Sequence, residues 1–408
     1  MRESTAEYYI GLDIGTSTVR CVIGTVDPNN PGKPSVVGHG SAPNLGMRKG
    51  VVVHIDDVVE AVVQAVTEAE RLSGVQVQRA TVNINGSHVT GMDSRGVIAI
   101  SVANREITLQ DRLRVEEAAT IVQMPPNREI IQVFAKNYRL DGQDNIKDPI
   151  GMHGVRLEVD THILTVATPN LKSLDGVLDR AHVTPSIHTV SSLAAAEAVL
   201  NRQQKESGTL LLDIGASTIN MVVIEDGEVQ HVAVVPFGGI NITNDLAIGL
   251  RTDLDIAEAV KLQHATLGEI PDSAITIRSG NTEHQFKARD VQLITEARVE
   301  ELLELVDKEL KRIHRSRKLP GGVVLVGGTA KLPGIAEFTR EKLKLAARIG
   351  QLQPLGGLVD TVQDLSYTSA VGLMLLDMLL VPNDHAQLGE PNANVFGLIT
   401  GLLKRFRK

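Results

Sequence analysis

The sequence predicts an α/β protein with two lobes of similar construction. Residues 9–25, YIGLDIGTSTVRCVIGT, and residues 209–225, TLLLDIGASTINMVVIE, share the pattern of a strand, a tight turn and a second strand. At an offset of 200, seven of the fourteen positions from Ile10 to Ile23 are identical, including the Asp, Gly, Ser and Thr of the turn. The second observation is that predicted strands alternate with predicted helices in both halves of the chain, which is typical of α/β architectures.

The elements of the first half follow from hydrophobic periodicity and from helix-start and helix-stop residues. They are a helix at 56–72, a strand at 80–84, a helix at 108–123 with Thr108 as its N-cap, a strand at 162–167 and a helix at 193–200. Between 87 and 160 the chain mixes short strands, one helix and a polar loop. This mixture predicts a small domain inserted into the first lobe.

The second half is expected to contain two long helices, a strand and a late core helix. The helices are predicted at 253–267 and 295–316, with a polar, strand-like stretch between them. The apolar strand at 323–328 ends in two glycines, and the core helix follows at 371–380. After it comes a polar linker rich in Pro and Asn.

Composition excludes several classes of protein. The chain has 408 residues, which is too long for one ordinary core. Its net charge of −8, its 2% aromatic residues and its lack of Trp argue against nucleic-acid binding. Cys21 is the single cysteine, so no intrachain disulfide can form, as is usual in a reducing compartment.

The same survey predicts a cytoplasmic chain, unless something attaches it to a membrane. The polar N-terminus lacks the pattern of a signal peptide. The longest nearly apolar run, residues 371–381, is shorter than the roughly 20 residues that span a bilayer.

The two repeated turns predict a site for a polyphosphate. The turn residues are Gly15, Ser17 and Thr18 in the first copy and Gly215, Ser217 and Thr218 in the second. Glycine lets the backbone approach a ligand, and consecutive N–H groups in a turn can hold phosphate. Asp13 and Asp213, at the strand ends, are placed to hold Mg²⁺ through water. One such turn alone is typical of a plain hairpin, and the pair is what predicts the site.

A third element fits the same site. The apolar strand VVLVGG, residues 323–328, ends in Gly327 and Gly328. Two adjacent glycines would let a flat base lie on the backbone.

The C-terminal segment 394–408, NVFGLITGLLKRFRK, predicts an amphipathic helix that lies on a membrane. Its apolar residues recur at three-and-four spacing, and basic residues gather at its end. A helix packed on the protein's own core is the alternative, which the preceding polar linker disfavours. The residues expected at the membrane are Val395, Phe396, Leu398, Ile399, Leu402, Leu403, Lys404, Arg405, Phe406, Arg407 and Lys408.

Four further segments carry a resemblance to a known family. They are GVVVHID (50–56), VNINGSHV (82–89), PFGGINITND (236–245) and AEAVK (257–261). The order of phosphate turn, connecting helix, second phosphate turn and glycine-ended strand resembles the actin, heat-shock chaperone and sugar-kinase superfamily. The four segments are similar to the bacterial FtsA cell-division family. The resemblance implies an actin-like bilobal fold with two ribonuclease-H-like subdomains, an inserted SHS2 subdomain and the C-terminal amphipathic helix.

The resemblance also implies subdomain boundaries. Subdomain 1A is expected at 1–86 and 163–200, the inserted subdomain 1C at 87–162, subdomain 2A at 201–240 and 321–370, subdomain 2B at 241–320, a return helix to 1A at 371–381, a linker at 382–393 and the membrane-targeting helix at 394–408.

ATP and Mg²⁺ are the implied ligands. The nucleotide-binding residues implied are Asp13, Gly15, Thr16, Ser17, Thr18, Asp213, Gly215, Ala216, Ser217, Thr218, Gly238, Gly239, Glu258, Lys261, Gly327, Gly328 and Thr329. In the family pattern, Gly238 and Gly239 lie beside the nucleotide, and Glu258 and Lys261 reach the ribose and base.

The chain departs from the family pattern at two places. Ala216 stands where relatives have glycine, and Ser191-Ser192 replaces Glu-Pro at the start of the connecting helix. Glu197 falls where actin keeps the glutamine that positions water, which makes it the candidate catalytic base, and a surface or helix-packing glutamate is the alternative. We expect at most a slow ATPase, with ATP acting as a conformational and assembly ligand.

The implied partners are those of a division protein at the cytoplasmic face of the cell membrane, at the septum. They are the C-terminal peptide of FtsZ on residues 241–320, anionic inner-membrane lipids, further copies in a filament or ring, and other division proteins through the insert. An acidic peptide would be attracted by the basic end of the helix at 295–316, which holds Lys311, Arg312, Arg315, Arg317 and Lys318.

Two other functions remain open at this point. A PilM-like pilus-assembly adaptor would share the fold and the insert, and a sugar or acetate kinase would share the superfamily. The terminal amphipathic segment favours the FtsA-like function over the first. The lack of a convincing motif for the base that a kinase needs near its acceptor disfavours the second.

Overall fold

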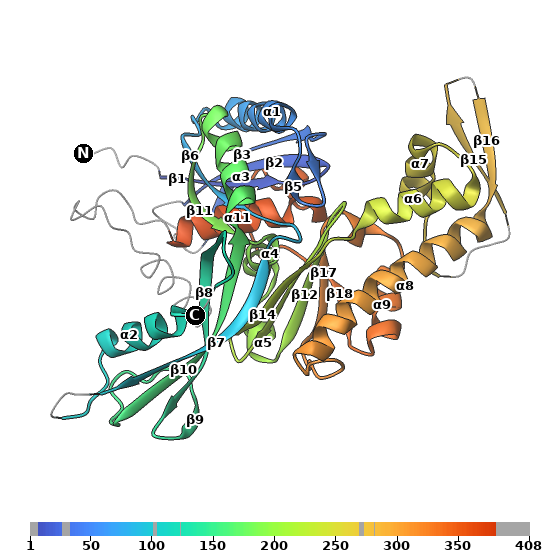
Figure 1. Cartoon of the computed structure of the whole chain (residues 1–408). Coiled ribbons are helices and arrows are strands. Elements are labelled where there is room, and N and C mark those ends of the chain that lie inside the picture. The colour runs from blue at the N-terminus through green and yellow to red at the C-terminus, as the bar shows by residue number, and fades with distance from the viewer. Residues whose placement is uncertain are drawn as a thin grey trace.

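Two sheets with the same strand arrangement form the body of the protein (Figure 1). The computed structural model describes residues 7–26, 33–100, 104–122, 124–268, 273–280 and 282–380. The first sheet has the order β11–β6–β1–β2–β3–β19, with β1 (Tyr8–Ile14), β2 (Thr18–Val26), β3 (Pro34–Pro43), β6 (Arg79–Asn83), β11 (Thr184–Thr189) and β19 (Gly356–Gly357). The second has the order β14–β13–β12–β17–β18, with β12 (Thr209–Ile214), β13 (Ile219–Glu225), β14 (Glu228–Val235), β17 (Gly322–Val326) and β18 (Ala347–Ile349).

Strand directions repeat in the two sheets. β1 lies antiparallel to β2 and parallel to β6, and β12 lies antiparallel to β13 and parallel to β17. The next strands outward repeat the correspondence. β3 and β14 are antiparallel to β2 and β13, and β11 and β18 are parallel to β6 and β17. The repeat in the sequence is therefore a repeat of the fold. We call the part built on the first sheet lobe 1 and the part built on the second sheet lobe 2.

Helices cover the sheets and join them. α1 (Ile55–Ser73) packs on β2 and β3, and α3 (Thr168–Arg180) lies beside it. α4 (Ser191–Val199) and α11 (Thr368–Leu380) pack against each other; α11 contacts β1, while α4 contacts β12 and β13. The shorter elements are β4 (Met47–Arg48), β5 (Val51–Val52), α5 (Arg202–Glu206), the 3₁₀ turns η1 (Gly328–Lys331) and η2 (Leu365–Tyr367), α9 (Ile335–Leu343) and α10 (Val359–Val362).

The inserted domain lies between β6 and α3. Its sheet has the order β7–β10–β8–β9, with β7 (Thr90–Ala99), β8 (Arg128–Leu140), β9 (Gln143–Ile146) and β10 (Arg156–Ala167), and α2 (Leu109–Thr120) covers one face. Thr108 caps α2 as predicted, since its side chain accepts from the backbone N–H of Asp111. The strand predicted at 162–167 is only the second half of β10, which pairs with β7 and β8 as far as Thr165 and Ala167, respectively. The boundary expected after residue 162 therefore falls inside a strand of the insert.

The outer part of lobe 2 is a helical layer with a hairpin. It contains α6 (Gly239–Leu250), α7 (Leu254–His264), the hairpin of β15 (Ala274–Ser279) and β16 (Thr282–Lys287), and α8 (Ala288–Arg312). α8 begins seven residues before the predicted start at 295, and it ends at Arg312 instead of 316. The early start is stabilised by burial, because Ala288 and Val291 extend the buried stripe of the helix toward its N-terminus.

Other helix ends also differ from prediction. α2 ends at Thr120 instead of 123, α4 begins at Ser191 instead of 193, and α11 begins at Thr368 instead of 371. The two early starts are serine and threonine positions that are buried in the structure. Because these first residues are polar, apolar periodicity alone does not locate the start of the helix.

Across the residues that the structure describes, no helix has both the length and the apolar character that crossing a bilayer requires. The linker and the amphipathic helix expected at 382–408 lie outside the described residues.

The insert packs against lobe 2, although its chain leaves and re-enters lobe 1. The backbone N–H of Val232 in β14 donates to His162 Nε2 of β10 at 3.1 Å. Lys147 Nζ donates to Glu206 Oε2 at 3.0 Å and to the carbonyl of Asp226 at 2.9 Å. Phe134 of the insert belongs to the same hydrophobic cluster as Val232. We call this contact the insert joint.

Two buried histidines meet in the insert joint. The rings of His162 and His231 lie edge to face, with centroids 5.2 Å apart. The charged groups around them are Asp93, whose Oδ1 lies 2.7 Å from His162 Nδ1, Lys136, which pairs with Asp93 at 3.0 Å, and Glu309 and Arg312 of α8, each 3.4 Å from His231 Nε2.

His231 should make the stability of the folded chain depend on pH. Burial first, and then the positive charges of His162 and Arg312, lower the pKa of His231 to about 3. An unfolded histidine has a pKa of about 6.5, so below that pH the unfolded chain binds a proton that the folded chain does not. Folding stability therefore falls as pH falls. Going from about pH 7.5 to about pH 5.5 should cost about 1 kcal/mol from this group.

Thermal melting at the two pH values checks this expectation. His231→Gln should lose less stability on acidification than the parent does. His54→Gln, at an exposed histidine on α1's N-terminal side, should keep the full loss. An equal acid loss in the parent and in His231→Gln would contradict the assignment.

Candidate functional site

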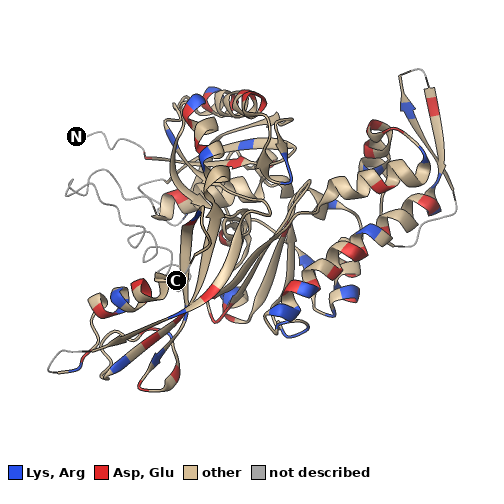
Figure 2. Cartoon of the chain, viewed as in Figure 1, with Lys and Arg blue, Asp and Glu red and all other residues tan. Residues whose placement is uncertain are grey.

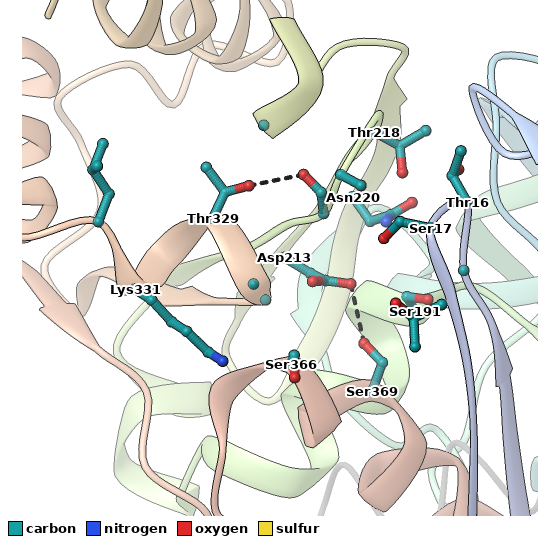
Figure 3. Close-up of a pocket in the computed structure, with 18 of the residues that line it drawn as sticks. Thr16, Ser17, Ser191, Asp213, Thr218, Asn220, Thr329, Lys331, Ser366 and Ser369 are labelled. Carbon is teal, nitrogen blue, oxygen red and sulfur yellow. Dashed lines mark hydrogen bonds between the residues drawn. The ribbon is translucent and has the colours of Figure 1, made fainter. Parts of the chain in front are cut away.

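A cavity of about 480 Å³ lies between the two lobes, where the repeated turns face each other (Figure 3). The β1–β2 turn, the β12–β13 turn and the end of β17 all contribute to its wall. The predicted nucleotide residues that line it are Asp13, Gly15, Thr16, Ser17, Thr18, Asp213, Gly215, Ala216, Thr218, Gly239, Glu258, Lys261, Gly327, Gly328 and Thr329. Ser217 and Gly238 are not among the lining residues.

The two turns touch each other directly. Ser217 Oγ donates to Thr16 Oγ1 at 2.7 Å, and the backbone N–H of Gly50 donates to the same oxygen at 3.2 Å. Each turn is closed by an equivalent hydrogen bond. In the first turn the Gly15 N–H donates to the Thr18 carbonyl at 3.1 Å, and in the second the Gly215 N–H donates to the Thr218 carbonyl at 2.9 Å. The two lobes are thus bonded to each other at the predicted phosphate end of the cavity.

Two buried carboxylates face this end. Asp13 Oδ1 accepts from Asn83 Nδ2 at 2.6 Å, and Asp213 Oδ2 accepts from Ser369 Oγ at 3.0 Å. Burial raises the pKa of Asp13 to about 7, against the opposing charge of Arg20. Burial also raises the pKa of Asp213, against its hydrogen bonds from Ser369 and Asn220. A nearby cation would relieve the cost of burying both groups in ionised form.

The residues present fit a magnesium ion that arrives with a nucleotide. Among the described residues there is no group of three or more His, Cys, Asp or Glu side chains that could hold a metal by themselves. Mg²⁺ is commonly bound by one or two carboxylates, with water and substrate phosphates as the other ligands. Asp13 and Asp213 would supply the carboxylates. Asn220 Oδ1, buried without a hydrogen-bond partner in the structure, adds a free oxygen in the same wall.

The other end of the cavity is built from α7 and the segment after β17. Lys261 Nζ lies 2.6 Å from Glu258 Oε2, donates to Thr243 Oγ1 at 2.8 Å and reaches the Gly239 carbonyl at 3.3 Å. Thr329 Oγ1 donates to the Gly215 carbonyl at 3.0 Å, so the end of β17 is tied to the second turn. The predicted ribose and base residues are therefore held in one hydrogen-bonded network.

Comparison with known proteins identifies the family. A family model described as the SHS2 domain inserted in FtsA matches residues 86–165, and one described as cell division protein FtsA matches residues 210–372. The cell division protein FtsA of Bacillus subtilis (strain 168) is 36% identical over 373 residues, which cover 90% of this chain and 83% of that protein. The chain belongs to the FtsA family of cell-division proteins.

Solved structures show that this FtsA-family chain has the actin-like fold. A PilM–PilN type IV pilus biogenesis complex matches with a TM-score of 0.64 and 17% identity, covering 90% of this chain and 98% of that one. MreB5 of Spiroplasma citri bound to ADP matches with a TM-score of 0.54 and 13% identity, covering 91% and 96%. At such identities the likeness concerns the fold alone.

The catalytic base expected in this FtsA-family chain is not in the cavity. Glu197 pairs with Lys205 at 2.7 Å and does not line the wall, whereas Ser191 of the same helix does. Six residues along a helix rotate a side chain by about 240°, so the two cannot share a face. The catalytic role of Glu197 therefore stays a prediction, which its place outside the cavity wall does not favour.

Several lining residues of the FtsA-family site were missed by sequence reasoning. They are Ile14, Arg20, Gly50, Asn85, Ser191, Asn220, Ile242, Leu262, Gln263, Ala265, Lys331, Leu332, Pro333, Ser366 and Ser369. Two of them could have been found from the sequence. Arg20 and Asn220 occupy equivalent positions of the repeat, and both are polar residues in largely apolar strands. Arg20 stacks over Tyr367 at 5.3 Å, and its Nε is buried without a hydrogen-bond partner in the structure.

Proposed function

We propose that this FtsA-family protein binds ATP with Mg²⁺ in the cavity and tethers FtsZ to the cytoplasmic face of the cell membrane at the division septum. The single observation that supports it best is the pair of buried carboxylates, Asp13 and Asp213. They are presented by two equivalent turns to one cavity, in a chain whose family is that of cell-division proteins.

In this proposal, the chain's own residues bind and orient the nucleotide. The turns at Gly15 and Gly215 hold the phosphates, and the network of Glu258 and Lys261 receives the ribose and base. Mg²⁺, when bound, neutralises phosphate charge. Because Glu197 lies outside the cavity wall, hydrolysis is expected to be slow, and ATP serves to set the conformation and the assembly of copies into a filament or ring.

Membrane attachment is proposed for the C-terminal segment 394–408. The described chain ends with α11 at Leu380, so the linker residues would separate this segment from the two lobes. Burying an apolar side chain contributes about 1.5–3 kcal/mol, and each basic residue near an anionic leaflet adds about 1 kcal/mol. Several of each kind in one short helix offset the cost of ordering it.

The FtsZ peptide is proposed to bind the outer part of lobe 2, but not mainly through the basic end of α8. Figure 2 shows acidic and basic residues interspersed along this helix. Lys311 pairs with Asp307 at 2.8 Å, Arg312 with Glu309 at 3.0 Å and Arg315 with Glu225 at 2.8 Å. These pairs reduce the attraction for an acidic peptide that the sequence alone suggested.

Exposed apolar side chains on α6 and α8 offer a better docking surface. Ile248 is 77% exposed and Leu293 is 54% exposed. They flank a close approach of the two helices, where a Cβ on Gly249 would lie 2.5 Å from Ile294 Cδ1. A peptide that packs apolar side chains here would use burial for affinity and the remaining charges for orientation. The insert is proposed to bind other division proteins.

The alternative functions are less well supported. The PilM likeness is at 17% identity and concerns the fold alone, whereas relatives above 30% identity are named as FtsA. Neither the structural likeness nor the named relatives cited above support a kinase.

Flotation of anionic liposomes with purified FtsZ tests the proposal. The full chain should carry FtsZ to the lipid fraction, and FtsZ without its C-terminal peptide should stay behind. Ile248→Asp should reduce FtsZ recruitment several-fold, while Leu72→Asp, at a partly exposed apolar position on α1 in lobe 1, should leave it unchanged. Equal recruitment of FtsZ with and without its peptide would refute the proposed partner segment.

A further inference from the structure

The N-terminal end of α11 reaches across to the predicted metal carboxylate of the other lobe. Ser369, the second residue of α11, donates its Oγ to Asp213 Oδ2 at 3.0 Å (Figure 3). Ser369 is buried and lines the cavity. Asp213 belongs to β12 of lobe 2, whereas α11 packs on the sheet of lobe 1. This hydrogen bond therefore crosses between the lobes.

α11 is fixed to lobe 1 along its length. Near its C-terminal end, the buried Asp377 accepts from the backbone N–H of Ile10 at 2.9 Å and from Thr81 Oγ1 at 2.8 Å, which ties it to β1 and β6. Near its N-terminal end, it approaches β1 so closely that a Cβ on Gly11 would lie 2.2 Å from the Ala370 carbonyl oxygen. Ser369 consequently takes its position from lobe 1.

The second oxygen of Asp213 is confined by lobe 2. Gly327 has φ of +88°, and a Cβ there would lie 2.4 Å from Asp213 Oδ1. The carboxylate thus lies between a hydroxyl from lobe 1 and the glycine backbone at the end of β17. Without this hydroxyl, no hydrogen bond from lobe 1 would restrain the rotation of the carboxylate.

The equivalent carboxylate of lobe 1 is held differently. Asp13 accepts from Asn83, which lies at the end of β6 in the same lobe. Ser191, at the start of α4, contacts Asn83 and Asn85 through its Oγ, at 3.2 and 2.7 Å, and is not hydrogen-bonded to Asp13 itself. The repeat is broken at this point, because Asp213 has a hydrogen bond from across the cavity in addition to that from Asn220 of its own lobe, whereas the partner of Asp13 lies within lobe 1.

We propose that Ser369 is a positioning residue that orients Asp213 for the magnesium ion of the bound nucleotide. The cation would then bind well only when lobe 1 holds Ser369 against Asp213, which couples magnesium binding to the relative placement of the lobes. The inference rests on the proposed binding of Mg²⁺–ATP in this cavity. Partners that orient a metal-ligating group typically change metal affinity by about 10–100-fold when removed.

The test measures how much Mg²⁺ is needed to tighten the binding of a fluorescent ATP analogue. In Ser369→Ala, half-maximal tightening should require about 10-fold more Mg²⁺ than in the parent. Affinity for the analogue in EDTA should stay within about twofold, because Ser369 acts through the carboxylate. Ser369→Thr, which keeps the hydroxyl, should restore the parent's magnesium requirement.

A neighbouring hydroxyl supplies the matched control. Thr368 Oγ1 donates to the Leu365 carbonyl at 2.9 Å, and Thr368 does not line the cavity. Thr368→Val should keep the parent's magnesium requirement, and thermal melting should show that all variants are folded.

Two results would overturn the inference. One is an unchanged magnesium requirement in Ser369→Ala. The other is an equal loss of affinity with Mg²⁺ and in EDTA, which would mean that Ser369 acts on the nucleotide or on the fold. If the parent itself shows no magnesium-dependent binding, the proposed function fails instead.

Discussion

Replacing Asp213 with alanine should reduce magnesium-dependent ATP binding by about 100-fold or more, the upper end of the range for changes around a metal ligand. The carboxylate is buried at the end of β12 and faces Asp13 across the cavity. Without it, one carboxylate would remain to hold the ion. Isothermal titration with ATP and Mg²⁺ measures the loss directly.

The same substitution should not destabilise the fold. Burial raises the pKa of Asp213, so the ionised group is costly in the folded chain, and alanine removes that cost. Thermal melting should therefore give an equal or higher midpoint. Asp226→Asn, at an exposed position between β13 and β14, serves as the control and should bind like the parent. Parent-like binding by Asp213→Ala would exclude this carboxylate from the site.

Removing residues 394–408 should abolish flotation with anionic liposomes while leaving melting and ATP binding intact. The deletion removes the expected apolar face and the basic cluster together. Leu402→Glu alone should act almost as strongly, because burying a carboxylate among acyl chains is expensive. Neutralising Lys404 and Arg405 should weaken binding mainly on anionic lipids, and raised salt should have the same effect through screening.

The helical spacing of the segment provides a matched control for this experiment. Thr400 is two positions from Leu402, about 200° away around a helix, so Thr400→Glu should retain most of the liposome binding. A truncated chain that melts lower and aggregates, yet still floats with liposomes, would show that the segment packs on the protein itself.

The two-lobed architecture was predictable from the sequence because each copy of the repeated strand–turn–strand motif consists of consecutive residues. Asp13 and Asp213 end equivalent strands, and equivalent strands in equivalent sheets place them at equivalent turns. Hydrophobic periodicity located α1 and the central strands β1, β2, β6, β12, β13 and β17, but not the outer strands β3, β11, β14, β18 and β19. Local patterns also predicted the cap at Thr108.

Features that depend on distant contacts escaped prediction. Ser369 and Asp213 are separated by 156 positions, and no local pattern links them. Glu197 was assigned by its place in the family pattern, but in the structure its side chain pairs with Lys205. The packing of the insert on lobe 2 rests on single contacts such as that of His162 with Val232, which become visible only in the folded chain.

The insert joint also determines how mechanical load would pass through the molecule. The insert is covalently attached to lobe 1 at both of its ends, while Lys147 and His162 hold it to lobe 2. A partner that pulls on the insert would thus stretch two covalent connections to one lobe and shear a set of hydrogen bonds on the other. The shear connection is the weaker of the two. Tension would therefore separate the insert from β14 first while the covalent connections hold.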